Sequence, residues 1–250
     1  MNNDSEKGIR RQTRYQKNYS GTQELLDIEE GLAGYNLDIV KKLYKGLGLP
    51  KNMEAQSILD FGAGTGALAE VWKSEFGIEP ICIEIDPHLI EKLKKKGFAT
   101  YASIGLISVE VMAIYTSNVL EHIENDVQAL RYIKSKMKKG GKIGIYVPAL
   151  PILFSDLDRN AGHFRRYKKN ELVSKVTLAG FKIQACYYND CIGVLASLAL
   201  RVLGYKNRVG LGSKKSLIFY DRFIYPVSAM LDKILFKRVI GKNLFLFAEN

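Results

Sequence analysis

Cysteine is scarce in this chain of 250 residues, and no long apolar run occurs in it. The three cysteines (Cys82, Cys186 and Cys191) form an odd set without the spacing of a metal site, so we expect reduced thiols and no metal. No apolar run reaches the roughly 18 residues that span a bilayer, and the polar first twenty residues argue against a signal peptide. We therefore expect a cytoplasmic protein, with peripheral attachment to the inner face of the membrane as an alternative.

Negative charge is also in short supply, because the formal net charge is +11. The excess is uneven: residues 201–242 hold ten lysines and arginines against only Asp221 and Asp232. Such asymmetry points to an anionic partner, which could be a membrane surface, a nucleic acid or a phosphorylated substrate.

What the chain does have is an alternation of short apolar runs with segments of helical periodicity. An amphipathic helix over residues 34–47 comes first. Alternating strands and helices of these lengths predict a parallel sheet covered on both faces. The expected strands are 57–61, 80–85, 111–117, 142–148, 181–188 and 243–249, and the expected helices between them are 67–76, 87–97, 125–141 and 169–180.

We divide the chain into a helical segment (1–50, its first 30 residues loosely held), a core (51–190), a basic helical insertion (191–242) and a final strand (243–250). Pro226 is expected to start the second helix of the insertion. This helix pair could lie on an anionic membrane or could cover the active site as a lid. Its apolar stripe at helical spacing consists of Leu217, Tyr220, Ile224, Val227, Leu231 and Ile234.

The stretch SILDFGAGTGALAE carries most of the functional information. A strand ends at Asp60, the chain turns through Gly62, Gly64 and Gly66, and a helix begins. Glycines allow a ligand to approach the backbone N–H groups at the helix start. Glu84, which closes the next strand, lies where a carboxylate can accept both hydroxyls of a ribose. Three glycines and two acids in these places favour an adenosine-bearing cofactor over a turn that binds nothing.

Two such cofactors fit the turn. The pattern Gly62-x-Gly64-x-x-Ala67, with Glu84 about 20 residues on, matches the dinucleotide fingerprint of NAD enzymes. However, the form Asp-x-Gly-x-Gly-x-Gly resembles motif I of class I S-adenosylmethionine (SAM)-dependent methyltransferases. SNVLEHIEND resembles the motif after their fourth strand, and FKIQACYY and NLFLFAE resemble their last two strands. From about Tyr35 onward, this resemblance implies a Rossmann-like α/β fold with a seven-stranded, mostly parallel sheet and a helical insertion before the last strand.

Further pieces are similar to a bacterial and archaeal subgroup of these enzymes that is associated with glycosyltransferases and envelope sugars or lipids. They are AGYN, IEIDP, GGKIGIYVPALP, LDRNAGHFRRY and GKNLFLFAE. The resemblance implies methyl transfer from SAM to a small or lipid-linked, anionic saccharide-type acceptor.

The resemblance also implies which residues bind SAM. Glu84 would bind the ribose, and Ile85 would pack on the adenine. The segment 98–108 lacks the acid that often binds the adenine amino group, and Met112 replaces a frequent Asp, so we expect backbone contacts to the adenine. The remaining expected contacts are Asp60, Gly62, Ala63, Gly64 and Gly66 at the methionine end, Ser103 and Ile104 at the adenine edge, and Asn118 and Val119 beside the sulfonium.

Candidate acceptor residues follow the fourth and fifth strands, at the edge where such sheets bind ligands. His122 could act as a general base, since its ordinary pKa of about 6.5 suits proton removal, or could only cap a helix or bond a backbone group. His163, Arg165, Arg166 and Tyr167 are the other candidates, because paired arginines bind phosphate or carboxylate. The alternative is that Arg165 braces Asp156 or Asp158.

Three other functions were weighed. The positive charge suggests a nucleic-acid (RNA) methyltransferase, but the chain lacks the Asn-Pro-Pro-aromatic and Pro-Cys motifs and a separate RNA-binding module, which disfavours nucleic acid. An NAD-dependent oxidoreductase and a SAM-binding protein without catalysis are the other two.

Overall fold

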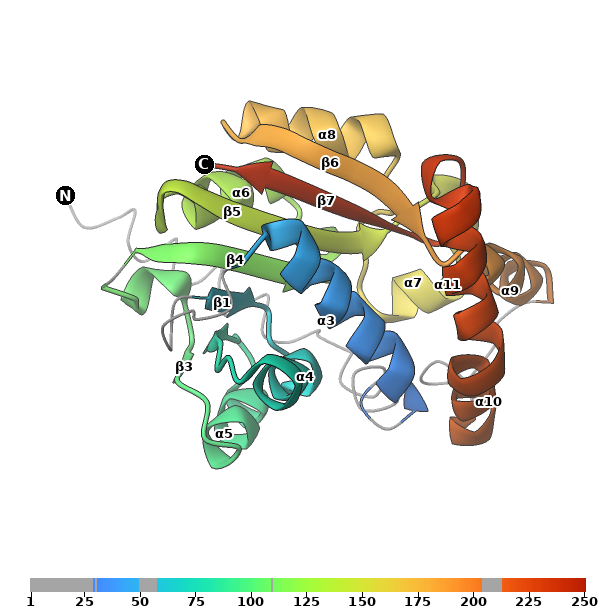
Figure 1. Cartoon of the computed structure of the whole chain (residues 1–250), viewed down its shortest axis with the longest axis horizontal. Coiled ribbons are helices and arrows are strands. Elements are labelled where there is room, and N and C mark those ends of the chain that lie inside the picture. Colours follow the sequence, from blue (N-terminus) through green and yellow to red (C-terminus); the bar gives the residue numbers. More distant parts are fainter. Residues whose placement is uncertain (1–28, 30, 50–57, 109, 204–212) are drawn as a thin grey trace.

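The computed structural model describes residues 29, 31–49, 58–108, 110–203 and 213–250; the loosely held segment expected at the N-terminus and residues 204–212 of the insertion lie outside this part. Seven strands form one sheet in the order β3-β2-β1-β4-β5-β7-β6 (Figure 1). All neighbours pair in parallel except that β7 runs antiparallel to both β5 and β6. The predicted fold is confirmed. The strands are β1 (Ile58–Phe61), β2 (Ile81–Ile83), β3 (Thr100–Tyr101), β4 (Val111–Ser117), β5 (Met137–Pro148), β6 (Lys182–Asn189) and β7 (Asn243–Glu249).

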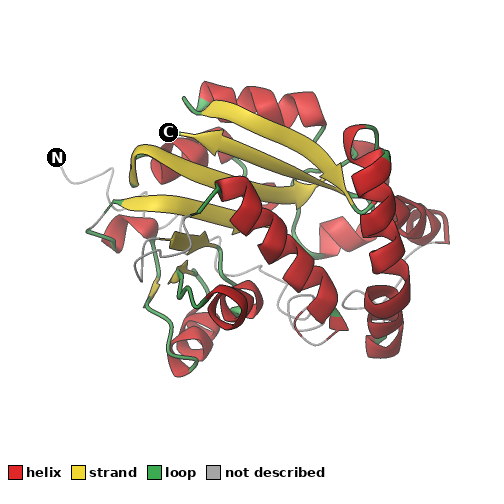
Figure 2. Ribbon diagram, in the orientation of Figure 1, coloured by secondary structure: helices red, strands yellow, loops and turns green. Residues whose placement is uncertain are grey.

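Helices cover both faces of the sheet (Figure 2). Buried side chains of α6 and α8 pack against one face, and those of α3 and α4, with Trp72 at the centre, pack against the other. The bounds are α3 (Ala33–Leu47), α4 (Ala67–Phe76), α5 (Pro87–Lys95), α6 (Asp126–Lys134), α7 (Asp156–Asn160), α8 (Lys169–Leu178), α9 (Cys191–Leu203), α10 (Lys214–Phe219) and α11 (Tyr225–Ile234).

The helix predicted over 125–141 is too long. The structure ends α6 at Lys134 and begins β5 at Met137, which pairs with Val111 of β4. Gly140 and Gly141 lie inside β5, and their backbones exchange hydrogen bonds with Asn250. Sheet pairing therefore overrides the helical periodicity of this segment.

The order of the strands reverses between β1 and β4, so the loops after these two strands diverge at the carboxyl edge of the sheet. Ligands of open α/β sheets bind at such a switch point. The helices α7, α9 and α11 also lie at this edge (Figure 1). The insertion is thus placed beside the edge where the predicted cofactor and acceptor residues gather.

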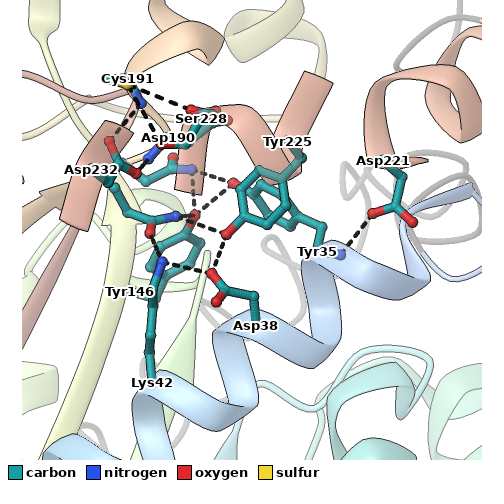
Figure 3. A network of polar contacts seen from close by, with 12 residues as sticks. Tyr35, Asp38, Lys42, Tyr146, Asp190, Cys191, Asp221, Tyr225, Ser228 and Asp232 are labelled. Atoms are coloured by element: carbon teal, nitrogen blue, oxygen red, sulfur yellow. Dashed lines mark hydrogen bonds and ion pairs between the residues drawn. The ribbon is translucent and has the colours of Figure 1, made fainter. Parts of the chain in front are cut away.

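A network of polar contacts joins the insertion to the sheet and to α3 (Figure 3). Asp190, at the end of β6, donates its backbone N–H to Asp232 and accepts hydrogen bonds from Tyr220 and Ser228. Asp221 accepts from the backbone N–H groups of Gly34 and Tyr35, which caps the start of α3 from 186 residues away. The insertion is therefore docked on the core through Tyr220, Asp221, Ser228 and Asp232.

The apolar stripe predicted for the insertion is only partly buried. Leu217 and Tyr220 pack against the core, as expected, whereas Val227 and Ile234 are exposed. The helical run α10, η4 (Tyr220–Ile224) and α11 is continuous, but η4 is a π-helical turn. A wider turn rotates the following residues away from a regular 3.6-residue stripe, and α11 buries Tyr225, Ser228 and Asp232 instead.

Candidate cofactor and acceptor site

The glycine turn after β1 is held by short backbone hydrogen bonds. The N–H groups of Gly62 and Ala63 both donate to the Ile83 carbonyl at 2.9 Å. Gly62 has a φ of 85°, and a Cβ at this position would lie 2.3 Å from a methyl group of Val119. Glycine is therefore required at position 62, both for the backbone conformation and for the contact with the loop after β4.

Glu84 links this turn to the end of β2. One carboxylate oxygen accepts from the Gly64 N–H at 2.8 Å, and the other accepts from the N–H groups of Ile85 and Asp86 at 2.7 and 3.0 Å. Burial raises the pKa of Glu84, while these backbone hydrogen bonds oppose the shift. Ile85, next along the chain, is 61% exposed. A fixed carboxylate beside an exposed apolar side chain fits the ribose and adenine of SAM, because the oxygen that accepts from Gly64 keeps a lone pair for a hydroxyl.

Asp60 lies beneath the same turn and is fully enclosed. Its carboxylate accepts a hydrogen bond from the Tyr115 hydroxyl at 2.8 Å. Burial raises the pKa of Asp60 to about 7; the Tyr115 bond opposes this shift and the nearby charge of Glu84 adds to it. Its predicted place at the methionine end of SAM stays a prediction, and a cationic amino group there would favour the ionised form.

We expect Asp60→Asn to remove a pH-dependent cost of folding. The pKa of Asp60 is raised from 3.8 to about 7 in the fold. Below about pH 4 the carboxyl is protonated in both the folded and the unfolded state and costs no stability. As the pH rises from about 4 through about 7, folding stability is lost because burial opposes ionisation in the folded state only. Asparagine is neutral throughout and can still accept from Tyr115. The variant should therefore gain about 2–4 kcal/mol of unfolding free energy relative to the parent between about pH 4 and 8.

Urea unfolding of both proteins across this range measures the difference. Glu70→Gln, which removes an exposed acid of α4 that pairs with Lys96, is the matched control for the loss of one negative charge. A difference between Asp60→Asn and the parent that stays constant with pH would contradict the raised pKa.

The other residues predicted to bind SAM lie on two loops at the same edge. Val119 packs on Gly62, and Asn118, with a φ of 52°, donates its backbone N–H to the Tyr146 carbonyl at 2.8 Å. Ser103 accepts from the Gly105 N–H at the start of η1 (Ile104–Leu106). The Ile104 side chain is buried in the core, so the predicted contact of this segment with adenine would involve its backbone and Ser103.

His122 and His163 lie against each other on the acceptor side. Their rings are perpendicular, with centroids 4.5 Å apart. Burial lowers the pKa of His122 to about 3; His163 adds to the shift, and a hydrogen bond to the Gly162 backbone opposes it. This bond corresponds to the alternative given above, in which His122 bonds a backbone group and is not catalytic. The role of His122 as a base stays a prediction, and so low a pKa weakens that role in this state.

The side chains of Arg165, Arg166 and Tyr167 point into the protein. Arg165 donates to Asp126 at 2.9 Å and to two backbone carbonyls, and the Tyr167 hydroxyl donates to the same aspartate at 2.8 Å. Arg166 is buried and donates to Asp158 at 2.7 Å. These contacts favour the bracing alternative, with Asp126 rather than Asp156 or Asp158 as the partner of Arg165. Contact with the acceptor stays a prediction for all three.

Two acids in this region were missed as site residues by the sequence analysis. Asp158 bonds the His163 ring at 3.0 Å as well as Arg166, and the backbone N–H of Phe164 donates to the Glu121 carbonyl. Burial raises the pKa of Asp158, but its bonds to His163 and Arg166 outweigh burial and leave it at about 2. Glu121 is adjacent to His122 in LEHI. This position indicates a site residue only when the loop that holds His163 is known to lie beside it.

Comparison with known proteins decides the family. A family model described as a methyltransferase domain matches residues 29–185, which is more than half of the chain. The chain belongs to this methyltransferase family. The predicted cofactor is confirmed: this methyltransferase uses SAM, which settles the choice against NAD. A search of curated protein sequences finds no match.

Solved structures agree on the fold of this methyltransferase. It is similar to a SAM-dependent methyltransferase from Archaeoglobus fulgidus, with 20% identity over 86% of this chain and 94% of that chain and a TM-score of 0.54. It is also similar to phosphoethanolamine N-methyltransferase 2 from Haemonchus contortus in complex with SAM (16% identity, 85% and 52% coverage, TM-score 0.55). A third is geranyl diphosphate C-methyltransferase from Streptomyces coelicolor (12%, 85% and 79%, TM-score 0.55). At these identities the likeness shows the fold alone.

The lengths and apolarity of the helices also show whether any of them could span a membrane. Within the part of the methyltransferase that the structure describes, none of the helices has the length and apolarity needed to cross a bilayer.

Proposed function

We propose that this methyltransferase moves the methyl group of SAM to a small or lipid-linked, anionic saccharide-type acceptor, as the envelope-associated subgroup would. Methyl transfer from a sulfonium is an in-line displacement on an activated carbon, so the protein mainly orients the two partners and excludes water. The observation that carries the proposal is the fixed Glu84 carboxylate at the glycine turn, because a cofactor bound by it would lie at the edge of the sheet that also holds the histidine pair. The acceptor oxygen, nitrogen or carbon would then approach from the side of His122 and His163.

A lipid-linked acceptor is supported by the exposed face of the insertion. Phe219, Phe223, Val227, Met230 and Ile234 are all exposed and follow one another at steps of three or four residues along α10, η4 and α11. They therefore form one apolar row on the side opposite the core. Exposed apolar rows of this length mark interaction surfaces in soluble proteins. The basic residues that accompany the row are Lys214, Lys215, Arg222, Lys233, Lys237 and Arg238.

The apolar face reaches the acceptor side through α9. Leu195 and Leu198 of this helix are exposed, and Arg201 donates to the carbonyl of Ile152 in η3 (Pro151–Leu153), which directly follows β5. Ile152 is itself 69% exposed. Apolar side chains flanked by lysine and arginine suit an anionic bilayer surface, where the chains enter the acyl boundary and the cations meet the headgroups. We propose that this face rests on such a membrane and that the acceptor reaches the site from it.

The membrane face predicts a specific loss of binding. The double variant Phe223→Ser/Met230→Ser should reduce partitioning onto vesicles that contain anionic phospholipid by at least about tenfold, since each exposed side chain would leave an apolar environment. Vesicle flotation measures this. The matched control is Tyr132→Ser/Leu178→Ser, which removes two exposed apolar side chains from α6 and α8 and should leave partitioning unchanged.

Vesicles of neutral lipid alone should bind the parent weakly, because the lysines and arginines then find no anionic headgroups. If the parent fails to float with anionic vesicles, the membrane proposal is wrong and the insertion acts only as a cover over the edge of the sheet.

The proposed reaction is tested with labelled SAM. Calorimetry should show binding of SAM or S-adenosylhomocysteine in the micromolar range. Transfer of the labelled methyl group should be found in the lipid-linked saccharide fraction of a cell-envelope extract. Transfer to RNA and not to envelope fractions would replace the proposed acceptor class.

A further inference from the structure

We propose that Glu121, His122 and His163 form a binding site for one divalent transition-metal ion. The three come from two loops that are 41 residues apart in the chain, and each offers one ligand atom within 4.8 Å of the other two. Glu121 and His122 belong to η2 (Leu120–His122), directly after β4, while His163 follows α7. The sequence analysis expected no metal, because this cluster exists only after the two loops have met.

The two imidazole rings are oriented as metal ligands are. A histidine that binds a metal uses one ring nitrogen and donates its other N–H to a carboxylate or a backbone carbonyl. The Nδ1 atom of His163 lies 3.0 Å from a carboxylate oxygen of Asp158, and its Nε2 atom lies 4.0 Å from the Glu121 carboxylate. The ring of His122 is bonded to the backbone of Gly162. One nitrogen of each ring is thus fixed, and the other ring nitrogen of His163 faces Glu121.

The supports of these ligands are themselves rigid. Asp158 is buried and is held by Arg166 and by the backbone N–H and hydroxyl of Ser155. The loops are tied together where the Phe164 N–H donates to the Glu121 carbonyl at 2.8 Å. Glu121 itself is fully buried. Small rotations of the side chains would bring the three donor atoms to the roughly 2.0–2.2 Å that nitrogen and carboxylate ligands keep from zinc.

The donor set selects the kind of ion. Two imidazole nitrogens and one carboxylate suit Zn²⁺, Mn²⁺ or Fe²⁺, whereas Mg²⁺ and Ca²⁺ favour oxygen ligands throughout. Three protein ligands also leave coordination positions open, as in catalytic rather than structural sites.

The site deepens the proposed function, on which the following step rests. An acceptor hydroxyl at an open position would lose its proton more readily, because a bound cation lowers the pKa of the oxygen that it contacts. The proton passes to solvent, the oxygen forms a bond with the methyl carbon, and the carbon–sulfur bond breaks to release S-adenosylhomocysteine. We therefore infer that the acceptor atom is a hydroxyl oxygen. In this arrangement His122 is a metal ligand and need not act as the base.

Metal binding is measured on chelator-treated protein titrated with Zn²⁺ and Mn²⁺ by calorimetry, together with the visible spectrum of the Co²⁺ form. We expect one ion per chain at micromolar affinity or tighter. Glu121→Gln and His163→Gln should each weaken this binding by at least about 100-fold, as loss of a ligand does. The control is His88→Gln, which changes the exposed histidine at the start of α5 and should leave metal binding as in the parent.

SAM binding by each variant shows whether the fold and the cofactor side are intact. Variants that lose the metal and keep SAM support the site. A parent that binds no ion, or binding that survives in both ligand variants, overturns it. If the parent does not bind SAM, the proposed function is wrong, whereas the result for the metal site is unaffected.

Discussion

Replacing Glu84 with glutamine is expected to weaken SAM binding by about 100-fold, which corresponds to about 3 kcal/mol. The carboxylate accepts three backbone hydrogen bonds from Gly64, Ile85 and Asp86, and it is predicted to bind the ribose as well. An amide has only one oxygen, so its NH₂ group would face donors on one side. Both the charge-assisted bonds to the ribose and the shape of the glycine turn would suffer.

Calorimetric titration with SAM measures this loss. Glu91→Gln is the matched control, because Glu91 is an exposed acid on the nearby helix α5 and its change removes one negative charge and only an exposed ion pair with Lys95. An affinity of the Glu84 variant within a factor of a few of the parent would remove the ribose role.

Asp158→Ala is expected to lower the free energy of unfolding by about 3–5 kcal/mol, because it leaves the Arg166 guanidinium buried without its counter-charge. The double variant Asp158→Ala/Arg166→Met should recover a large part of this loss, since it removes both charges and fills the space. The pKa of Asp158 is lowered from 3.8 to about 2, so this stabilisation is present above about pH 4 and is lost as the pH falls through about 2.

Urea unfolding at neutral pH tests the buried pair. The exposed pair of Asp156 and Arg159 on the same helix is the control, and Asp156→Ala should cost no more than about 1 kcal/mol. Equal losses at both positions, or a double variant as unstable as Asp158→Ala, would contradict the importance of the buried charge.

The parts of the fold that sequence could predict are those set by local patterns. The strand ending at Asp60, the glycine turn and helix α4 were predicted almost to the residue, because glycine spacing and apolar runs act over a few positions. Helix α6 was overextended because the residues after Lys134 owe their conformation to pairing with β4 and with Asn250. Local periodicity contains no information about such partners.

The same limit applies to the predicted acceptor residues, because the sequence does not show which side chains they contact. The sequence identified His122, His163 and Arg165 as candidates from their place after strands. It offered Asp156 or Asp158 as partners of Arg165, but it could not show that Arg165 would bind Asp126 of α6 and that Asp158 would bind Arg166. Likewise the π-helical turn at Tyr220–Ile224 determines which apolar residues of the insertion face solvent. The spacing of the predicted apolar stripe did not indicate this turn.

The last strand has a consequence for how the molecule is made. Residues 243–249 form β7, which lies between β5 and β6 and pairs with both along its length. During translation those two strands therefore expose unpaired edges until residues 243–249 have left the ribosome, and their register depends on partners that lie 54 residues or more downstream. Strands that wait for a distant partner fold slowly and can join the edges of other chains. Loss of β7 would thus detach β6 from the sheet and leave the edge of β5 open to pairing with other chains.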